Sequence, residues 1–234
     1  GNTALHLAAR KGCEAVVKHL TKAYADIEAK NDNSETPLFE VIKGNSEMSL
    51  LGVDTGSSEA VFQLLLSAGA DQEAKNIHGQ TPLFIAARLG NEAMVKLLLE
   101  VGANKEAKDF TERTPLSIAA TWRTCSNVLR LLIKAGADKE AKDRNGDTPL
   151  NWAAQMARRE AVRILIEAGA DKEAENEQGY RPLHSAARLN KEYIVRLLVE
   201  AGADKKAKSR DGKTPLRIAS EEGHRTIVDI LRFS

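Results

Sequence analysis

Apolar residues recur along the chain in short stripes with helical spacing. After Thr81-Pro82, the residues Leu83, Ala86 and Ala87 fall at i, i+3 and i+4, which places them on one face of a helix. The Thr hydroxyl can cap free backbone amides, and Pro at the first helical position has no amide hydrogen to leave unpaired. The pattern therefore predicts a short helix that begins at Pro82.

A second helix and an exposed connection are predicted to follow. Gly90 can end the first helix in a left-handed conformation. Val95 and Leu98 then repeat the helical spacing, and Gly102 ends this second stripe. Residues 104–113 are charged and rich in turn formers, so they are predicted to form an exposed hairpin or finger before the next helix.

This pattern occurs seven times. The spacings between successive Thr-Pro-Leu motifs or their variants are 33, 45, 33, 34, 33 and 33 residues. One helix pair cannot bury both of its faces, so the repeats are predicted to stack on one another in a row. The predicted repeats are 1–35, 36–80, 81–113, 114–147, 148–180, 181–213 and 214–234.

Residues 143–170 carry the fullest version of the motif. They read Asp-x-x-Gly-x-Thr-Pro-Leu-x-x-Ala-Ala and then, with small departures, Val-x-x-Leu-Leu-x-x-Gly-Ala. This pattern resembles the ankyrin repeat family over essentially the whole chain. The resemblance implies an all-α fold: an elongated, curved solenoid of stacked antiparallel helix pairs with β-hairpin fingers. It also implies that 1–234 form a single ankyrin repeat domain that binds proteins.

The 45-residue spacing places 12 extra residues in the second repeat. They are predicted to form an inserted loop over 44–58, at the edge opposite the fingers. Within it, residues 53–58 resemble the active-site turn of pepsin-like aspartic proteases. That chemistry needs two carboxylates that share a proton, and only Asp54 is present in such a motif. We therefore interpret the segment as a surface turn and predict that the chain is not an enzyme.

Composition excludes several other classes of protein. The chain has 34 basic and 33 acidic residues, a net charge of +1, so it lacks the positive field that favours binding to nucleic acid. No apolar run approaches 18 residues, which argues against membrane insertion. Cys13 and Cys125 lie far apart and the histidines lack metal-ligand company, so we expect no disulfide, metal or cofactor. The predicted location is cytoplasmic.

Charge is distributed unevenly along the chain. Residues 1–117 contain 12 basic and 16 acidic residues, whereas residues 118–234 contain 22 and 17. The two halves therefore carry net charges of −4 and +5. This difference predicts a partner with an acidic patch that contacts the later repeats.

Binding is expected where the repeats differ from one another while their frame stays the same. These positions are the finger tips, the residue before Thr-Pro, and the exposed face and end of the first helix. Trp152 and Phe84 could instead serve packing, whereas Phe110 and Trp122 lie where burial is not demanded. The predicted protein-binding residues are Ile77, His78, Gln80, Phe84, Arg88, Phe110, Thr111, Arg113, Trp122, Arg123, Arg144, Asn145, Asp147, Trp152, Gln155, Tyr180, Arg188 and Leu189.

The function predicted from these observations is a non-enzymatic protein–protein interaction module or scaffold. It would bind a protein partner through its concave groove and finger tips, as a monomer. The alternative is a recognition or substrate-recruiting arm of a larger multidomain receptor or enzyme, with the catalytic part outside this chain. Gly1 begins in the middle of a finger, so we expect the chain to be an excerpt of a longer one.

Overall fold

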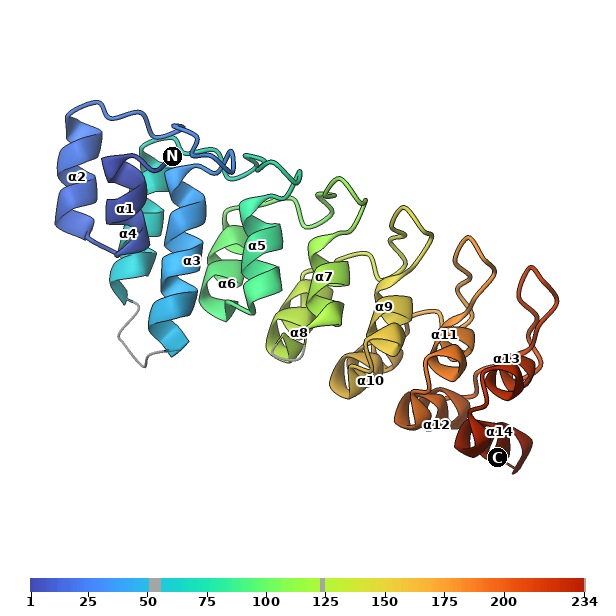
Figure 1. The fold of residues 1–234 in the computed structure, drawn as a ribbon. Coiled ribbons are helices and arrows are strands. Elements are labelled where there is room, and N and C mark those ends of the chain that lie inside the picture. The colour runs from blue at the N-terminus through green and yellow to red at the C-terminus, as the bar shows by residue number, and fades with distance from the viewer. Residues whose placement is uncertain (51–55, 123–124, 234) are drawn as a thin grey trace. The chain divides into compact units, whose positions relative to one another are not determined.

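The computed structural model describes residues 1–50, 56–122 and 125–233. These residues contain fourteen helices in seven consecutive pairs and no strand (Figure 1). The helix pairs agree with the predicted all-α fold, whereas the predicted β-hairpin fingers are present in the described residues only as turns and bends. The chain divides into two compact units, Gly1–Phe110 and Thr111–Ser234, and each is described by itself.

The first unit contains three helix pairs. The first helices of these pairs form one layer, in which α3 contacts both α1 and α5, and α2 lies against α4 in a second layer. The helices are α1 (Ala4–Arg10), α2 (Glu14–Lys22), α3 (Pro37–Leu50), α4 (Gly56–Ser67), α5 (Pro82–Leu89) and α6 (Glu92–Glu100).

The second unit contains four helix pairs in the same two-layer arrangement. The odd-numbered helices contact one another in sequence order, and so do the even-numbered helices. The helices are α7 (Pro115–Thr121), α8 (Ser126–Lys134), α9 (Pro149–Gln155), α10 (Arg159–Glu167), α11 (Pro182–Arg188), α12 (Glu192–Glu200), α13 (Pro215–Glu221) and α14 (Arg225–Phe233).

The predicted Thr caps are confirmed at five of the seven first helices, whereas the buried Thr36 hydroxyl has no hydrogen-bond partner among the described residues. The Thr81 hydroxyl accepts a hydrogen bond from the backbone amide of Phe84 at 3.3 Å, and Pro82 occupies the first turn. Gly90 ends the same helix with φ of 71°, in the left-handed region that favours glycine. Equivalent hydroxyl caps occur at Thr3, Thr114, Thr148 and Thr214.

The prediction of an inserted loop over 44–58 is wrong for the helical part of that segment. Residues 44–50 continue α3, and residues 56–58 belong to the first turn of α4. The extra residues thus lengthen the two helices of the second repeat to 14 and 12 residues. Residues 51–55, including Asp54, lie outside the described residues.

The core of each unit lies between its two helix layers. In the first unit, the aromatic side chains of Phe39, Phe62 and Phe84 are fully buried. In the second unit, Leu residues such as Leu132 fill the same space, while paired Ala residues on the first helices allow close packing of neighbouring repeats. The core therefore runs from repeat to repeat within a unit.

Most fingers have an acidic or amide side chain at their base, and in the last finger Ser209 takes this place. One carboxylate oxygen of Asp143 accepts hydrogen bonds from the backbone amides of Asn145 and Asp147, both at 2.9 Å. Backbone hydrogen bonds join neighbouring finger tips. The amide of Arg144 donates to the carbonyl oxygen of Thr111 at 3.0 Å, and the amide of Glu177 donates to the carbonyl oxygen of Asn145 at 2.9 Å. Each finger thereby fixes the position of its neighbour.

The recurring Lys-Glu-Ala-Lys segments also join repeats. The Glu140 carboxylate accepts a hydrogen bond from the backbone amide of Asp171 at 2.9 Å, one repeat later. The Lys142 ammonium donates to the backbone carbonyl of Glu175 at 2.8 Å. These charged side chains therefore satisfy backbone groups of the next repeat, in addition to being exposed to solvent.

Candidate protein-binding surface

A pocket in the second unit gathers five of the predicted binding residues. It lies between two fingers and the start of α9 and has a volume of about 280 Å³. We call it the finger pocket. Its lining residues are Thr111, Arg113, Asp143, Arg144, Asn145 and Trp152.

Hydrogen bonds hold the side chains of the finger pocket in place. The indole nitrogen of Trp152 donates to the Asp143 carboxylate at 2.9 Å. The Arg113 guanidinium donates through Nε to the Thr111 hydroxyl at 2.8 Å. Because Asp143 already accepts from Trp152 and from two backbone amides, its charge is partly satisfied within the protein. Two Arg residues and a Trp held by Asp143 thus line the pocket.

Asp143 is a pocket residue that the sequence did not predict. It belongs to the constant frame of the repeat, since Asp or Asn recurs at the base of most fingers. A search for positions that vary between repeats passes over such a residue. Its place five residues before the Thr of Thr-Pro could have identified it as the residue that orients the finger.

Tyr180 and Arg188 form a second group of predicted residues in this unit. The Arg188 guanidinium carbon lies 5.4 Å from the centroid of the Tyr180 ring, within the range of a cation–π interaction. The ring of His184 also stacks on that of Tyr180, with the two ring centroids 5.8 Å apart. Tyr180 is half-buried and Arg188 exposed, so both remain accessible at the surface.

Asp147 and Gln155 lie beside this group, and Asp147 is buried. Burial raises the pKa of the Asp147 carboxyl, while hydrogen bonds from Asn176 and Gln155 lower it in part. The amide of Asn176, in the next finger, lies 2.9 Å from the Asp147 carboxylate. Asp147 therefore joins two neighbouring fingers.

In the first unit, the predicted residues Ile77, His78 and Phe110 are exposed together on adjacent fingers. The backbone amide of Phe110 donates to the carbonyl of His78 at 3.0 Å. The Phe110 side chain is 62% exposed, and its ring lies against the turn at Gly79. These residues present an apolar and aromatic finger surface. Arg88, another predicted residue of this unit, is partly buried on α5.

Three predicted residues are buried, and their side chains do not form a docking surface. Phe84 is 0% exposed because it fills the core between α5 and its neighbours. Gln80 is buried, and its side-chain oxygen accepts a hydrogen bond from the Asn76 amide in the same finger at 3.3 Å. Asp147 is buried as described above. We therefore leave these three out of the proposed binding surface.

Trp122 and Leu189 are exposed but lie away from the fingers. Both follow the last residue of a first helix, and Trp122 lines a different pocket, together with Ser126 and residues 156–161. The structure therefore does not bring Trp122 together with the finger pocket. Arg123, also predicted, lies outside the described residues.

Two histidines have structural roles. His6 Nε2 lies 2.9 Å from the carbonyl oxygen of Glu35, and His184 Nε2 lies 3.2 Å from that of Lys213, in each case at the base of the next finger. Within 1–50, 56–122 and 125–233, no group of three or more His, Cys, Asp or Glu residues is placed to hold a metal ion. None of the helices in these ranges is both long and apolar enough to cross a bilayer.

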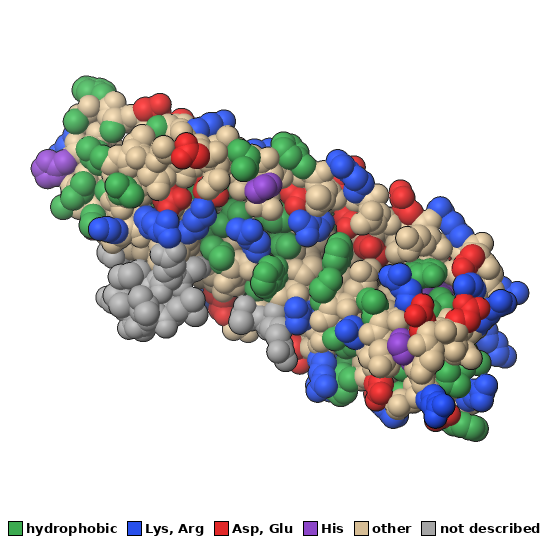
Figure 2. All heavy atoms as spheres, viewed as in Figure 1, with side chains coloured by type: hydrophobic (Ala, Val, Ile, Leu, Met, Phe, Trp, Pro, Cys, Tyr) green, Lys and Arg blue, Asp and Glu red, His purple; other side chains and the backbone are tan. Residues whose placement is uncertain are grey.

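Figure 2 shows Lys and Arg side chains interspersed with exposed hydrophobic side chains on one face of the protein. Stacked helix pairs, hydroxyl-capped first helices and exposed fingers define a repeat protein whose surface is suited to binding other proteins. Family models for ankyrin repeats match residues 1–32, 49–143, 111–176, 138–209 and 169–234. The chain therefore belongs to the ankyrin repeat family.

Ankyrin repeats are generally protein–protein interaction modules, and proteins built from them are typically not enzymes. A search of curated proteins finds no match to this chain.

Proposed function

We propose that this chain is a non-enzymatic module that binds a protein partner through its finger tips and the adjoining faces of its first helices. The observation that carries the proposal is the finger pocket, where Arg113, Arg144 and Trp152 surround a hollow of about 280 Å³. Arg and Trp are the residue types that most often dominate the free energy of protein–protein binding. The exposed Phe110 adds an aromatic contact on the first unit.

The proposed partner carries an acidic patch. The second unit, 111–234, contains 23 basic and 18 acidic residues, a net charge of +5. Opposite charge on a partner would speed the encounter more than it would strengthen the final complex. The proposal includes a single 1–234 module that acts as a cytoplasmic monomer.

Affinity capture from native lysate with matched variants tests the proposal. Phe110→Ala and Arg144→Ala are expected to reduce recovery of the specific partner several-fold, because both remove exposed side chains from the finger surface. Phe233→Ala and Arg196→Ala are the controls, since these residues are also exposed but lie on α14 and α12, away from the fingers. All four variants should melt within a few degrees of the wild type.

If the finger variants capture every partner as well as the control variants do, the finger surface is not the binding site. Loss of capture in all four variants alike would also contradict the proposal.

A further inference from the structure

Exposed hydrophobic residues form a ladder along the edge of the second unit opposite its fingers. Trp122, Met156 and Leu189 are 51%, 39% and 38% exposed. Each directly follows the last residue of a first helix, at equivalent positions in three consecutive repeats. Apart from Phe233, they are the large hydrophobic residues that the described part of this unit exposes. We call the ladder and the described residues that line the pockets beside it the turn edge.

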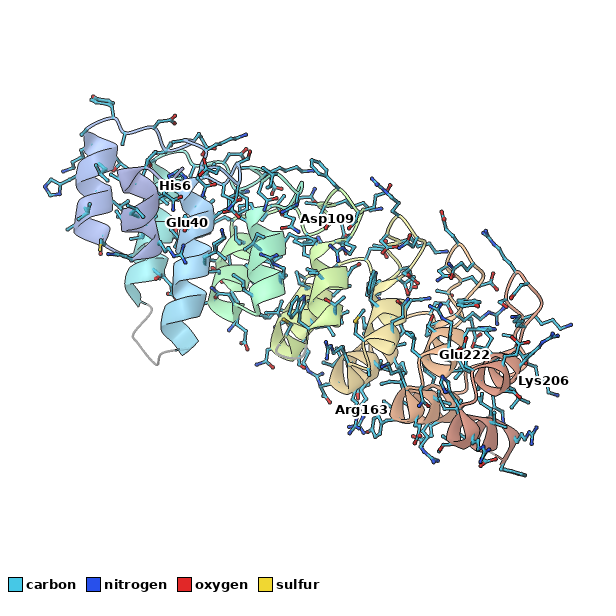
Figure 3. All side chains as sticks on the ribbon, viewed as in Figure 1. His6, Glu40, Asp109, Arg163, Lys206 and Glu222 are labelled. Atoms are coloured by element: carbon cyan, nitrogen blue, oxygen red, sulfur yellow. The ribbon has the colours of Figure 1, made fainter. Side chains whose placement is uncertain are left out.

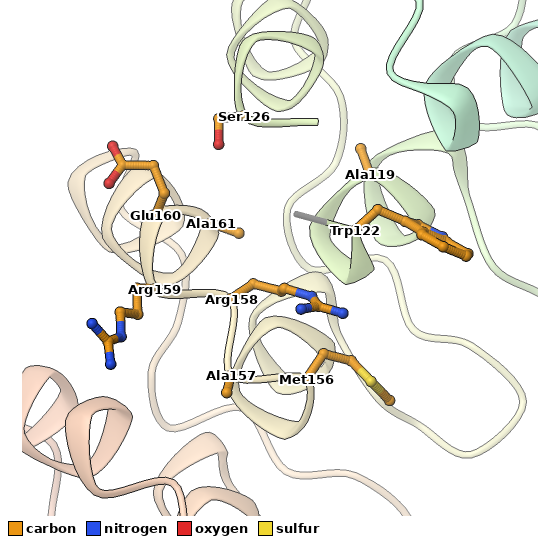
Figure 4. A pocket seen from close by; sticks show the side chains of 9 residues that line it. All are labelled: Ala119, Trp122, Ser126, Met156, Ala157, Arg158, Arg159, Glu160 and Ala161. Carbon is orange, nitrogen blue, oxygen red and sulfur yellow. The ribbon is translucent and has the colours of Figure 1, made fainter. Parts of the chain in front are cut away.

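Two neighbouring pockets hollow the turn edge. The larger, of about 480 Å³, is lined by residues at the ends of α7 and α9 and at the starts of α8 and α10, among them Trp122 and Met156 (Figure 4). The next, of about 260 Å³, includes Lys191 and Tyr193. Ala157 and Arg159 line both pockets, so the two pockets adjoin one another, and we call them together the depression.

Among the described residues that line the depression, three are basic and two are acidic. Arg158 donates through Nε to the carbonyl of Thr121 at 2.6 Å, which directs its guanidinium toward Trp122 and Met156 (Figure 4). The Arg159 guanidinium carbon lies 4.2 Å from the centroid of the Tyr193 ring.

Acidic groups compensate this basic charge only in part. Glu160 and Glu192 also border the depression. Glu160 already has a partner, because its carboxylate lies 3.3 Å from the guanidinium of Arg130 on α8. Arg163 of α10, which is labelled in Figure 3, donates a hydrogen bond to the Tyr193 hydroxyl, so the tyrosine ring is held in place.

The spacing of the ladder suits a helix. Neighbouring helices pack about 8–10 Å apart, so successive ladder residues lie at roughly that separation. Positions i and i+7 of an α-helix lie on one face and are about 10.5 Å apart. A helix also satisfies its own backbone hydrogen bonds, whereas an extended chain laid on an apolar ladder would leave amides and carbonyls unpaired.

We propose that the turn edge is a second docking surface, separate from the finger pocket, and that it binds an amphipathic helix with acidic residues beside an apolar stripe. The ladder packs against the apolar stripe of the bound helix, and Arg158, Arg159 and Lys191 form ion pairs with its carboxylates. Exposed apolar patches bordered by charge are typical of interaction sites.

The probe for this proposal is a synthetic acidic helix with Leu at every seventh position and Glu on both sides of the stripe. Binding to the whole chain is measured by titration calorimetry. Met156→Glu and Lys191→Glu are each expected to weaken binding about ten-fold. Both variants should fold, because Met156 is exposed and Lys191 precedes the first residue of α12, where an acidic side chain is favourable.

The controls separate this surface from others. Phe233→Glu and Arg196→Glu place the same charge elsewhere in the unit, and both should leave binding of the probe unchanged. Phe110→Ala should also leave it unchanged, since that residue tests the finger surface.

The proposal would be overturned if the acidic probe did not bind, or if a counterpart with Lys in place of Glu bound equally well. Equal binding of a variant probe in which two residues are replaced by Pro, which breaks the helix, would also overturn it, as would wild-type affinity in Met156→Glu. A loss of probe binding in Phe110→Ala would assign the probe to the fingers and would equally overturn it. None of these results bears on capture through the finger surface, which has its own variants.

Discussion

Gly146 lies at a finger tip that the next finger approaches closely. Its φ is 76°, and an added Cβ atom would lie 2.8 Å from the backbone nitrogen of Glu177. Gly212 has nearly the same φ, 74°, at the tip of a later finger, but a Cβ atom there would meet nothing within 4 Å. The two glycines share a backbone conformation and differ in their surroundings.

This difference predicts unequal costs for the same substitution. Gly212→Ala should lower the free energy of unfolding by about 1–2 kcal/mol, the penalty for a left-handed alanine. Gly146→Ala should cost more, because the neighbouring finger must also move and the hydrogen bond between Glu177 and Asn145 is disturbed. Urea unfolding of the two variants measures both costs, and equal values would contradict the close approach.

Asp147 predicts a dependence of stability on pH. Burial raises the pKa of its carboxyl in the folded chain above the usual 3.8. The folded chain therefore holds this proton more tightly than the unfolded chain does, and stability is lost as pH rises from 3.8 through the raised value. Asp147→Asn removes the titrating group. As pH rises through this window, the free energy of unfolding of the wild type should therefore fall relative to that of the variant.

Urea unfolding of both proteins at several values between about pH 3 and pH 7 measures the effect. A constant difference between the two proteins over that range would show that the carboxyl is not perturbed by burial.

Phe84 shows why the sequence overestimates the binding surface at the residue scale. It is the third helical residue after Thr81, where the other repeats have His, Phe, Ser, Asn or Arg. In the structure this position contacts the next repeat: the Asn151 amide donates to the carbonyl of Tyr180 at 3.2 Å, and His184 reaches Lys213. Variation there reflects packing between neighbours, which a single sequence does not separate from variation that serves a partner.

The helices were predictable because their boundaries are set locally. A Thr hydroxyl, a Pro and a terminal Gly each act within one turn, so the sequence alone places the ends of α5. The second repeat was not predictable in this way. Its Gly and Ser residues over 44–58 suggested a loop, yet much of that segment extends α3 and α4. Intrinsic propensity is a weak guide where a helix can continue from a packed one.

Burial within the helix pairs predicts which leucines matter. Leu132 on α8 is 0% exposed, so Leu132→Ala should lower the free energy of unfolding by about 2–5 kcal/mol through the cavity it leaves. The adjacent Leu131 is only partly buried, and Leu131→Ala should cost clearly less. Thermal and urea unfolding of the pair provide the measurement. Equal destabilisation would mean that the two side chains contribute alike to the core.

At the scale of the whole molecule, the charge difference predicts how binding responds to salt. Screening weakens attraction between separated charges, with a Debye length of about 10 Å at 0.1 M salt. The association rate with an acidic partner should therefore fall as salt rises, while the dissociation rate changes little. Stopped-flow or surface-based kinetics can follow both rates. An association rate that is independent of salt would rule out the acidic partner.

The number of repeats and the family follow from the sequence period, because each repeat carries its own complete set of signals. The binding sites are harder to predict, because they depend on which side chains of neighbouring repeats come together. Trp122 and Met156 lie 34 residues apart in sequence, yet they line one pocket. Only the stacking of two turns reveals that pairing, and Met156 was absent from the predicted residues for this reason.

The links between neighbouring fingers have a mechanical consequence. Asn145 binds Glu177 in the next finger, and Glu140 binds Asp171, so each repeat of the second unit is tied to the one beside it. Under tension, such a row would yield one repeat at a time, starting from an end. A freed repeat of 33 residues can extend to roughly 110–120 Å. The protein would then lengthen in regular steps as successive repeats unfold, and the repeats would refold and stack again when the force is released.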